Sequence, residues 1–230
     1  MIEAIQTYYG QDKNTCAHCG GRKINYGKTR YGAQRTYCKV CKKASVVAYR
    51  HKAYEGYVNA VLVRLLKEGY GIRSIARLLK IAINTVLTRI RSIARNIQPP
   101  LLRLHKEYEI DELCTYIGNK EHKIWIAGAW ERESKRIVRF TIGTRTNKTL
   151  QKVVQDILVS QPVKIGTDKL QNYFSLIPAA IHSTVKRVLQ HLERMHLTLR
   201  THIKRLNRKT LAFSKNKLML EAVLKIYLWY

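Results

Sequence analysis

Residues 109–142, EIDELCTYIGNKEHKIWIAGAWERESKRIVRFTI, decide the fold class of the C-terminal part of this chain. Apolar, β-branched and aromatic side chains gather in three segments, Glu109–Ile117, Lys123–Ala129 and Ile137–Ile142, with polar residues between them. Segments of this length and composition, bounded by turn-forming residues, are typical of β-strands. We therefore expect three consecutive antiparallel strands here.

The residues downstream predict helices that pack on this sheet. Apolar side chains recur at helical spacing between Leu150 and Leu158, and a long helix is expected around Gln190–Asn207. Between them, Val163–Asp168 is typical of a short buried strand that ends at an acid. Three antiparallel strands followed by helix, strand and helix is the element order of an RNase H-like α/β fold. We assign that fold to residues 99–230, because Pro99-Pro100 interrupts regular structure.

Three acidic residues fall where this fold would bring them together. Asp111 lies in the first strand, Asp168 at the end of the fourth, and Glu193 near the start of the long helix. A carboxylate cluster binds two Mg²⁺ or Mn²⁺ ions roughly 4 Å apart, and such a pair supports in-line phosphoryl transfer. The alternative is that Glu193 only forms a salt bridge with Arg194 or another neighbour. Spacing alone weighs the two interpretations evenly.

Four cysteines in the N-terminal part form two Cys-x-x-Cys pairs, Cys16 with Cys19 and Cys38 with Cys41. Two such pairs, separated here by 18 residues, suit one tetrahedral zinc ion. Disulfides and a redox pair are the alternatives, and no export signal is visible that would favour disulfides. We expect residues 1–52 to form a zinc ribbon with a hairpin at Lys23–Tyr37, held by structural zinc.

The next segment, residues 53–98, predicts three short helices, because apolar residues recur there at spacings of three and four. A helix, a brief turn near Lys80–Ala82 and another helix form the geometry that places the second helix of the pair in the DNA major groove. Asn84, Thr85 and Arg89 lie near the start of that helix and are the candidates for base contacts. The alternative is a plain three-helix bundle with solvated charges.

The net charge of the chain indicates which class of molecule it binds. The chain has 230 residues, with 43 Lys and Arg against 15 Asp and Glu, so its formal net charge is +28. Such a charge predicts polyanionic partners, of which nucleic acid is the commonest. No apolar run approaches the roughly 18 residues that span a bilayer, so we expect no membrane partner and a cytoplasmic, nucleoid-associated protein. Further candidates for backbone contact lie in and after the long helix: Arg194, Arg200, Arg205, Arg208 and Lys209.

Several motifs together resemble one known family. They are Glu109–Leu113 with Tyr116–Gly118, Thr167-Asp168 with Tyr173, Glu193-Arg194 with Leu197 and Leu199-Arg200, Arg205-Leu206, Arg208–Thr210, Phe213–Lys215 and, upstream, the cysteine pairs and Gly69–Leu79. They are similar to the insertion-sequence-one family of bacterial transposases. The resemblance implies a multidomain DDE-type recombinase that cuts double-stranded DNA at the ends of its mobile element and joins them to target DNA.

The same resemblance implies site residues and cofactors. Asp111, Asp168 and Glu193 would be the catalytic triad that binds Mg²⁺ or Mn²⁺, and Cys16, Cys19, Cys38 and Cys41 would bind zinc. Joining two DNA ends requires two active sites, so a homo-oligomer on DNA is expected.

Four residues at three places depart from the family's usual pattern. Lys169 stands where Gly often follows the second Asp, His196 stands where Asn is usual, and Ala82-Ile83 replaces a common Ser-Pro start of the recognition helix. Two alternatives to an active transposase therefore stay open. One is a catalytically inactive DNA-binding protein, either a decayed transposase or a transcriptional regulator. The other is an RNA-binding basic protein.

Overall fold

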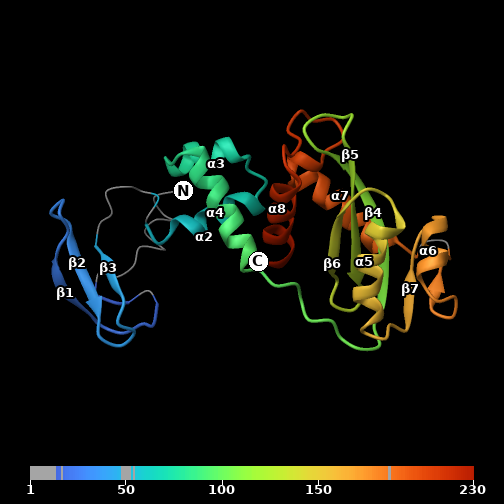
Figure 1. Cartoon of the computed structure of the whole chain (residues 1–230), viewed down its shortest axis with the longest axis horizontal. Coiled ribbons are helices and arrows are strands. Elements are labelled where there is room, and N and C mark those ends of the chain that lie inside the picture. Colours follow the sequence, from blue (N-terminus) through green and yellow to red (C-terminus); the bar gives the residue numbers. More distant parts are fainter. Residues whose placement is uncertain (1–13, 17, 48–52, 54, 186–187) are drawn as a thin grey trace. The chain divides into compact units, whose positions relative to one another are not determined.

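The computed structural model describes residues 14–16, 18–47, 53, 55–185 and 188–230, and its elements are labelled in Figure 1. The chain divides into two units, one of Met1–Leu66 with Gly71–Arg89 and the other of Lys67–Tyr70 with Ile90–Tyr230. The three expected domains, with boundaries after residues 52 and 98, stay a prediction. In the described ranges, no helix has both the length and the apolar character needed to cross a membrane.

The first unit contains a small antiparallel sheet in the order β1-β2-β3. Its strands are β1 (Lys23–Lys28), β2 (Gln34–Cys38) and β3 (Ala44–Val46). Ile24 pairs with Tyr37 in this sheet, so the expected hairpin is confirmed. The third strand was not predicted from the sequence, because three residues are too few to show a period.

Helices α2 (Val58–Lys67), α3 (Ile72–Leu79) and α4 (Ile83–Arg95) confirm the three expected helices. Their apolar stripes are buried, including Leu62 of α2, Ile75 of α3 and Val86 of α4. Between α3 and α4, Lys80 takes a left-handed conformation with φ 53°. Its backbone N–H caps the end of α3 by donating to the carbonyl of Arg77. The turn is therefore short and well defined.

The second unit is built on a five-stranded sheet in the order β6-β5-β4-β7-β8. Strands β4 (Glu107–Tyr116), β5 (Lys123–Glu131) and β6 (Arg136–Gly143) are antiparallel and confirm the three expected strands. Strand β7 (Lys164–Gly166) lies parallel to β4, and β8 (His182–Ser183) lies parallel to β7. The fourth expected strand is thus also confirmed, with narrower bounds.

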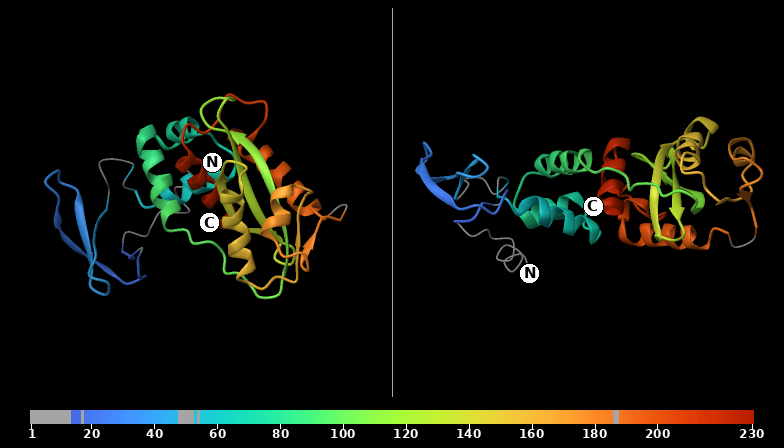
Figure 2. Two further views of the ribbon diagram at one scale, coloured as in Figure 1. Left: turned by 45° about the vertical axis from the view of Figure 1, so that its right-hand side comes forward. Right: turned by 90° about the horizontal axis from the view of Figure 1, so that it is seen from below.

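Helices cover both faces of this sheet. Figure 2 shows α5 (Asn147–Leu158) on one face and α7 (Gln190–His202) on the opposite face. Beneath α5 a core forms that includes Ile110, Leu150 and Ile157. Helix α7 ends earlier than expected, because the backbone of Ile203 turns extended, with φ −100° and ψ 91°. A short 3₁₀ turn, η2 (Lys204–Leu206), continues the chain.

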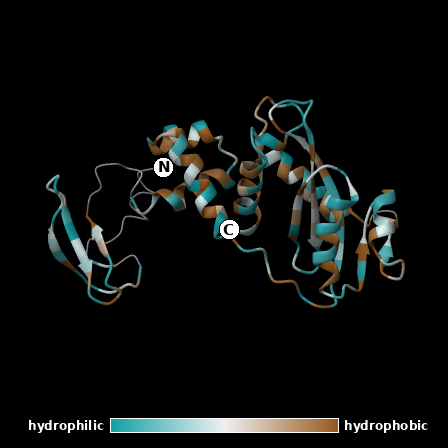
Figure 3. Ribbon diagram, viewed as in Figure 1, coloured by the Kyte–Doolittle hydropathy of each residue, from teal (hydrophilic) through white to brown (hydrophobic). Residues whose placement is uncertain are grey.

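Two helices were missing from the sequence prediction. The first, α6 (Gln171–Leu176), is only six residues long. The second, α8 (Lys217–Trp229), packs on the edge strand β6, where the Trp229 indole donates a 2.8 Å hydrogen bond to the carbonyl of Ile137. Figure 3 shows many hydrophobic residues along α8, whereas hydrophilic residues dominate the visible side of α5. Helix α8 thus covers a sheet edge that would otherwise expose unpaired backbone groups.

Candidate functional site

The four cysteine sulfurs of the first unit lie within 4.8 Å of one another. Cys16 Sγ is 3.6 Å from Cys41 Sγ, and Cys19 Sγ is 3.5 Å from Cys38 Sγ. A disulfide needs about 2.05 Å, so all four thiols are free. Four sulfurs at about 2.3 Å from one tetrahedral zinc ion would be about 3.8 Å apart. The donor set therefore fits zinc.

Backbone N–H groups at the first knuckle favour the thiolate form of Cys16, whereas burial and the neighbouring thiols raise the pKa of Cys41 to about 12. Backbone N–H groups of His18 and Cys19 point at the Cys16 sulfur and lower its pKa to about 6. Gly20 has φ +71°, a conformation that L side chains rarely adopt, and it forms the tight turn after Cys19.

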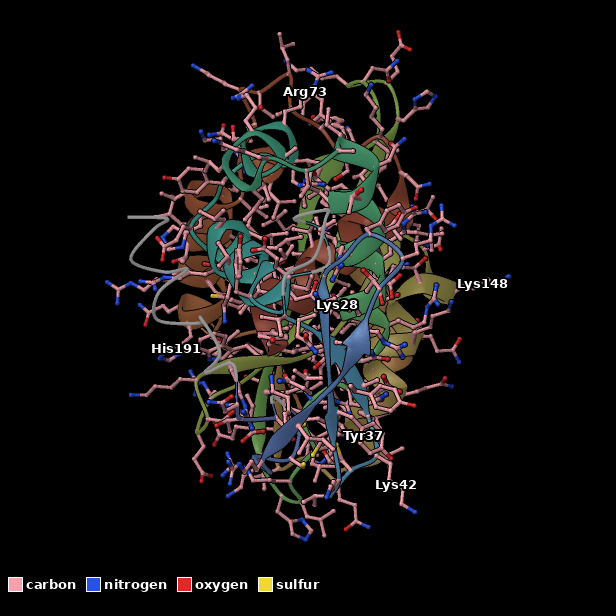
Figure 4. The ribbon with its side chains drawn as sticks, turned by 90° about the vertical axis from the view of Figure 1, so that its left-hand side faces the viewer. Lys28, Tyr37, Lys42, Arg73, Lys148 and His191 are labelled. Atoms are coloured by element: carbon pink, nitrogen blue, oxygen red, sulfur yellow. The ribbon has the colours of Figure 1, made fainter. Side chains whose placement is uncertain are left out.

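Figure 4 labels Lys28 near one end of the three-stranded sheet and Lys42 near the other, so basic side chains lie at both ends.

In the second unit, Asp111 and Asp168 lie close together next to the parallel strands β4 and β7. Glu109 of β4 is level with Gly166 of β7, and each acid lies two residues further along its strand direction. Carboxylate oxygens of Asp111, Glu112 and Asp168 lie within 4.8 Å of one another. Hard oxygen ligands at this spacing suit Mg²⁺ or Mn²⁺. Glu112 belongs to this cluster and was not predicted from the sequence.

Glu112 is anchored on both of its carboxylate oxygens. Its Oε1 accepts from the buried Tyr173 hydroxyl, and its Oε2 accepts from Arg145 Nε at 3.0 Å and lies 2.8 Å from Arg145 Nη2 in an ion pair. Arg145 also reaches Asp168, with Nη2 3.3 Å from Oδ2. Its guanidinium carbon lies 4.7 Å from the centroid of the Trp125 ring. Arg145 therefore joins two acids of the cluster.

Burial, together with the charges of Glu112, Asp168 and Glu193, raises the pKa of Asp111 to about 7. His196 of α7 places Nδ1 3.5 Å from Asp111 Oδ2. Burial and the charge of Arg200 lower the pKa of this imidazole to about 4. It is thus neutral at pH 7 and does not offset the negative charge of the cluster. Arg145 is the cation that pairs with Glu112 and Asp168, and Asp111 has no such partner among the described residues.

Helix α7 carries Glu193 in its first turn, as expected. Glu193 is exposed and stands outside the 4.8 Å group, although its charge raises the Asp111 pKa. Fully buried Glu109 holds the start of this helix. Its Oε2 accepts from the Leu192 N–H at 3.0 Å, and its Oε1 accepts from His191 Nδ1 at 2.7 Å. One strand thus positions both Asp111 and the helix that carries Glu193.

The expected DNA-contacting residues differ in their surroundings. In α4, Asn84 is exposed and Thr85 half-buried. Arg89 is half-buried and donates to Asn59 Oδ1 at 2.9 Å and to the carbonyl of Ala53. Its guanidinium is therefore engaged within the first unit, which the spacing of the sequence could not reveal.

The basic residues in and after α7 also differ in exposure and in hydrogen bonding. Arg194, Arg208 and Lys209 are exposed. Arg200 is half-buried, and its Nε has no hydrogen-bond partner among the described residues. Arg205 donates to Ser214 Oγ at 3.0 Å, and burial lowers its pKa. It ties η2 to a segment that pairs with the end of β4.

Comparison with known proteins gives a consistent family match. The family model described as IS1 transposase matches residues 107–229. The insertion element IS1 protein InsB of Shigella flexneri is 34% identical over 120 residues, which cover 52% of this chain and 92% of that protein. The insertion element IS1 4 protein InsB of Escherichia coli (strain K12) is 35% identical over 120 residues, covering 52% and 72% respectively.

A solved structure also matches weakly. It is the cryoEM structure of a simian T-cell lymphotropic virus intasome in complex with PP2A regulatory subunit B56 gamma. One of its chains aligns over 71% of this chain and 67% of itself, at 16% sequence identity and a TM-score of 0.35. A likeness of this size carries no argument about the fold.

Proposed function

This chain belongs to the IS1 transposase family, and on that premise we propose that it binds the ends of its insertion sequence and catalyses metal-dependent cleavage and transfer of DNA strands. Transposases of this family act on DNA, so the partner class is DNA. The observation that carries the proposed chemistry is the proximity of Asp111, within β4, to Asp168, just after the neighbouring parallel strand β7, with the Glu193 charge nearby.

The sheet order supports an RNase H-like fold for the second unit. Three antiparallel strands are followed by two that run parallel to the first, with a helix on each face. In this arrangement the first and fourth strands are neighbours, so Asp111 within β4 and Asp168 just after β7 converge. That convergence is what a shared divalent-ion site requires.

Asp111, Asp168 and Glu193 are the residues that would hold Mg²⁺ or Mn²⁺. When bound, the ions activate the attacking oxygen and stabilise the leaving oxygen. The chain's own groups prepare this site: Glu109 holds the start of α7, and neutral His196 lies against Asp111 without adding a competing charge. We therefore take His196 as compatible with an active site, although Asn is usual at this position in the family.

The first unit is the proposed DNA-recognition part. A short turn between α3 and α4, with a basic, partly exposed α4, supports a helix-turn-helix whose second helix enters the major groove. Four free thiols at zinc-binding distance support a zinc ribbon beside it. Phosphate contacts from both elements would position the chain, and Asn84 and Thr85 are the proposed base contacts.

Strand transfer at two DNA ends requires two catalytic centres, so we propose a homo-oligomer assembled on DNA. Acting on chromosomal insertion-sequence ends would place it in the bacterial cytoplasm at the nucleoid.

The test uses duplex DNA that carries the terminal inverted repeat flanking the reading frame. We expect Mg²⁺- or Mn²⁺-dependent cutting by the wild type, and its loss in Asp111→Asn, Asp168→Asn and Glu193→Gln. Matched controls are Asp156→Asn and Glu133→Gln, whose side chains are 58% and 56% exposed in salt bridges on the surface. Cutting by all three site variants at the wild-type rate would refute the triad. Cutting by Glu193→Gln alone would limit the site to the two aspartates.

A further inference from the structure

We infer that Arg145 is a catalytic residue that contacts a non-bridging oxygen of the scissile phosphate, and that Glu112 is the residue that positions it. This inference rests on the proposed function. It concerns two residues to which neither the family match nor the three-acid pattern assigns a role.

Glu112 is better suited to anchor a side chain than to bind a metal ion. Both of its oxygens already accept hydrogen bonds, one from Tyr173 and the other from Arg145. Its side chain has no exposed surface. In contrast, among the described residues the Asp111 side chain has one side-chain partner within ion-pair distance, His196, whose Nδ1 is 3.5 Å from its Oδ2. Asp168 is intermediate, because its Oδ1 accepts from the Leu170 N–H at 2.9 Å and its Oδ2 from Arg145 Nη2 at 3.3 Å. The least engaged carboxylate of the cluster is thus that of Asp111, and Glu112 holds Arg145.

Arg145 is held in one orientation from two sides. The Glu112 carboxylate accepts a hydrogen bond from Nε and pairs with Nη2. On the other side, the guanidinium carbon lies 4.7 Å from the centroid of the Trp125 ring. Arginine recognises phosphate through such a planar, pre-oriented set of donors. A third of the side chain, 34%, remains exposed, and its Nη1 hydrogens meet no acceptor among the described residues. The Arg145 guanidinium is therefore fixed in orientation, and its Nη1 hydrogens remain available as donors.

The position of Arg145 matches where phosphate charge would develop. Its Nη2 lies 3.3 Å from Asp168 Oδ2, so a phosphate bound at the aspartates is within its reach. In cleavage, a water oxygen bonds to phosphorus while the bond from phosphorus to one bridging sugar oxygen breaks and leaves its electron pair on that oxygen. One water proton goes to the leaving oxygen and the other stays on the new phosphate end. A guanidinium on a non-bridging oxygen stabilises the charge of that transition state.

The experiment combines variants of Arg145 with a change in the phosphate it is inferred to contact. Cleavage rates of the wild type and Arg145→Gln are measured on element-end DNA with a normal or a methylphosphonate scissile linkage, using each stereoisomer. A methylphosphonate replaces one non-bridging oxygen by a methyl group, so the linkage loses both that oxygen and its negative charge. We expect Arg145→Gln to slow cutting of normal DNA by about 10²–10³-fold. We expect that loss to shrink at least about tenfold on one methylphosphonate isomer, because the contact is then already gone.

Controls separate this contact from folding and from general charge. Arg136→Gln removes an exposed arginine at the start of β6 and should leave the cutting rate within about twofold of the wild type. Because Arg145→Gln leaves Glu112 buried without its cation, the double variant Glu112→Gln/Arg145→Gln is also measured, with its urea midpoint. We expect the double variant to fold, to bind Mg²⁺ as the wild type does, and to cut as slowly as Arg145→Gln.

The outcomes are distinct. Equal losses from Arg145→Gln on normal DNA and on both methylphosphonate isomers would overturn the contact, as would wild-type cutting by the double variant. If instead Asp111→Asn cuts normally, the proposed metal site fails, whatever Arg145 does.

Discussion

At the scale of single residues, burial and neighbouring charges act strongly on Asp111. Its folded-state pKa of about 7 lies above the value of about 3.9 expected in the unfolded chain. A raised folded pKa contributes stability that is fully present below about pH 4 and is lost as the pH rises through about 7. The ionised carboxylate is therefore disfavoured in the folded protein, and a bound cation would favour it.

We expect metal-free Asp111→Asn to be more stable than the metal-free wild type at pH 8, by up to about 4 kcal/mol, and equal to it near pH 4. Urea unfolding at a series of pH values measures the difference. Mg²⁺ added at pH 8 should stabilise the wild type and leave Asp111→Asn unchanged. The same pH dependence in both proteins would show that Asp111 does not carry the effect.

Glu109 is the residue that joins the sheet to the active-site helix. Its buried carboxylate accepts from Arg132 Nε at 2.9 Å as well as from His191 and the Leu192 N–H. We expect Glu109→Ala to cost about 2–3 kcal/mol of unfolding free energy, because these donors lose their acceptor. Glu109→Gln keeps an acceptor for the Leu192 N–H and should cost less. Urea midpoints compare the two variants, and an equal cost would contradict the capping role.

At the scale of elements, α8 protects an edge of the sheet. The Trp229 ring centroid is 4.9 Å from that of Phe140, and its indole N–H pairs with a carbonyl of β6. We expect Trp229→Ala to lower the unfolding free energy by about 3 kcal/mol, since large-to-small changes of aromatic residues cost about 3–5 kcal/mol when fully buried. Static light scattering should then report more association, because the β6 edge is less covered. Unchanged stability would mean that α8 contributes little to the second unit.

The cysteine cluster is the other element that can be tested separately. Removing one ligand by Cys38→Ser should lower bound zinc from about one ion per chain to a small fraction, because structural zinc uses four ligands. Since folding and zinc binding are coupled in such modules, calorimetry should show loss of the first unit's transition while that of the second unit persists. The control is Cys114→Ser, a change in β4 outside the cluster. Full zinc retention in Cys38→Ser would exclude the four-sulfur site.

At the scale of the whole molecule, charge governs the affinity for DNA. With a net charge of +28, binding should release many counterions and weaken steeply with salt. We expect an affinity loss of about 10³–10⁵ between 50 and 200 mM salt, as for proteins with about 6–10 phosphate contacts. Fluorescence anisotropy on element-end duplex measures the slope. A flat salt dependence would argue against phosphate contacts as the main source of affinity.

The sequence alone identified most elements of this fold. Strands β4 to β6 and helix α5 have regular apolar periods, and such local patterns survive in any tertiary context. Elements β3, α6 and β8 have at most six residues, too few for a period. Helix α8 was missed for the opposite reason: apolar residues occupy much of its circumference, so no single stripe stands out. The spacing of the cysteines predicted a cluster that the structure brings together.

What the sequence by itself determined is therefore local: which segments become strands or helices, which four sulfurs suit one ion, and which family the motifs resemble. Only the tertiary structure decided which distant side chains meet. In an ideal strand Glu112 faces away from Asp111, and nothing in the sequence links it to Arg145. The pairing of β4 with β7 and the loop after β6 bring Glu112, Arg145 and Asp168 together. Contacts of this kind depend on strand order and register, which are set by the packing of the whole unit.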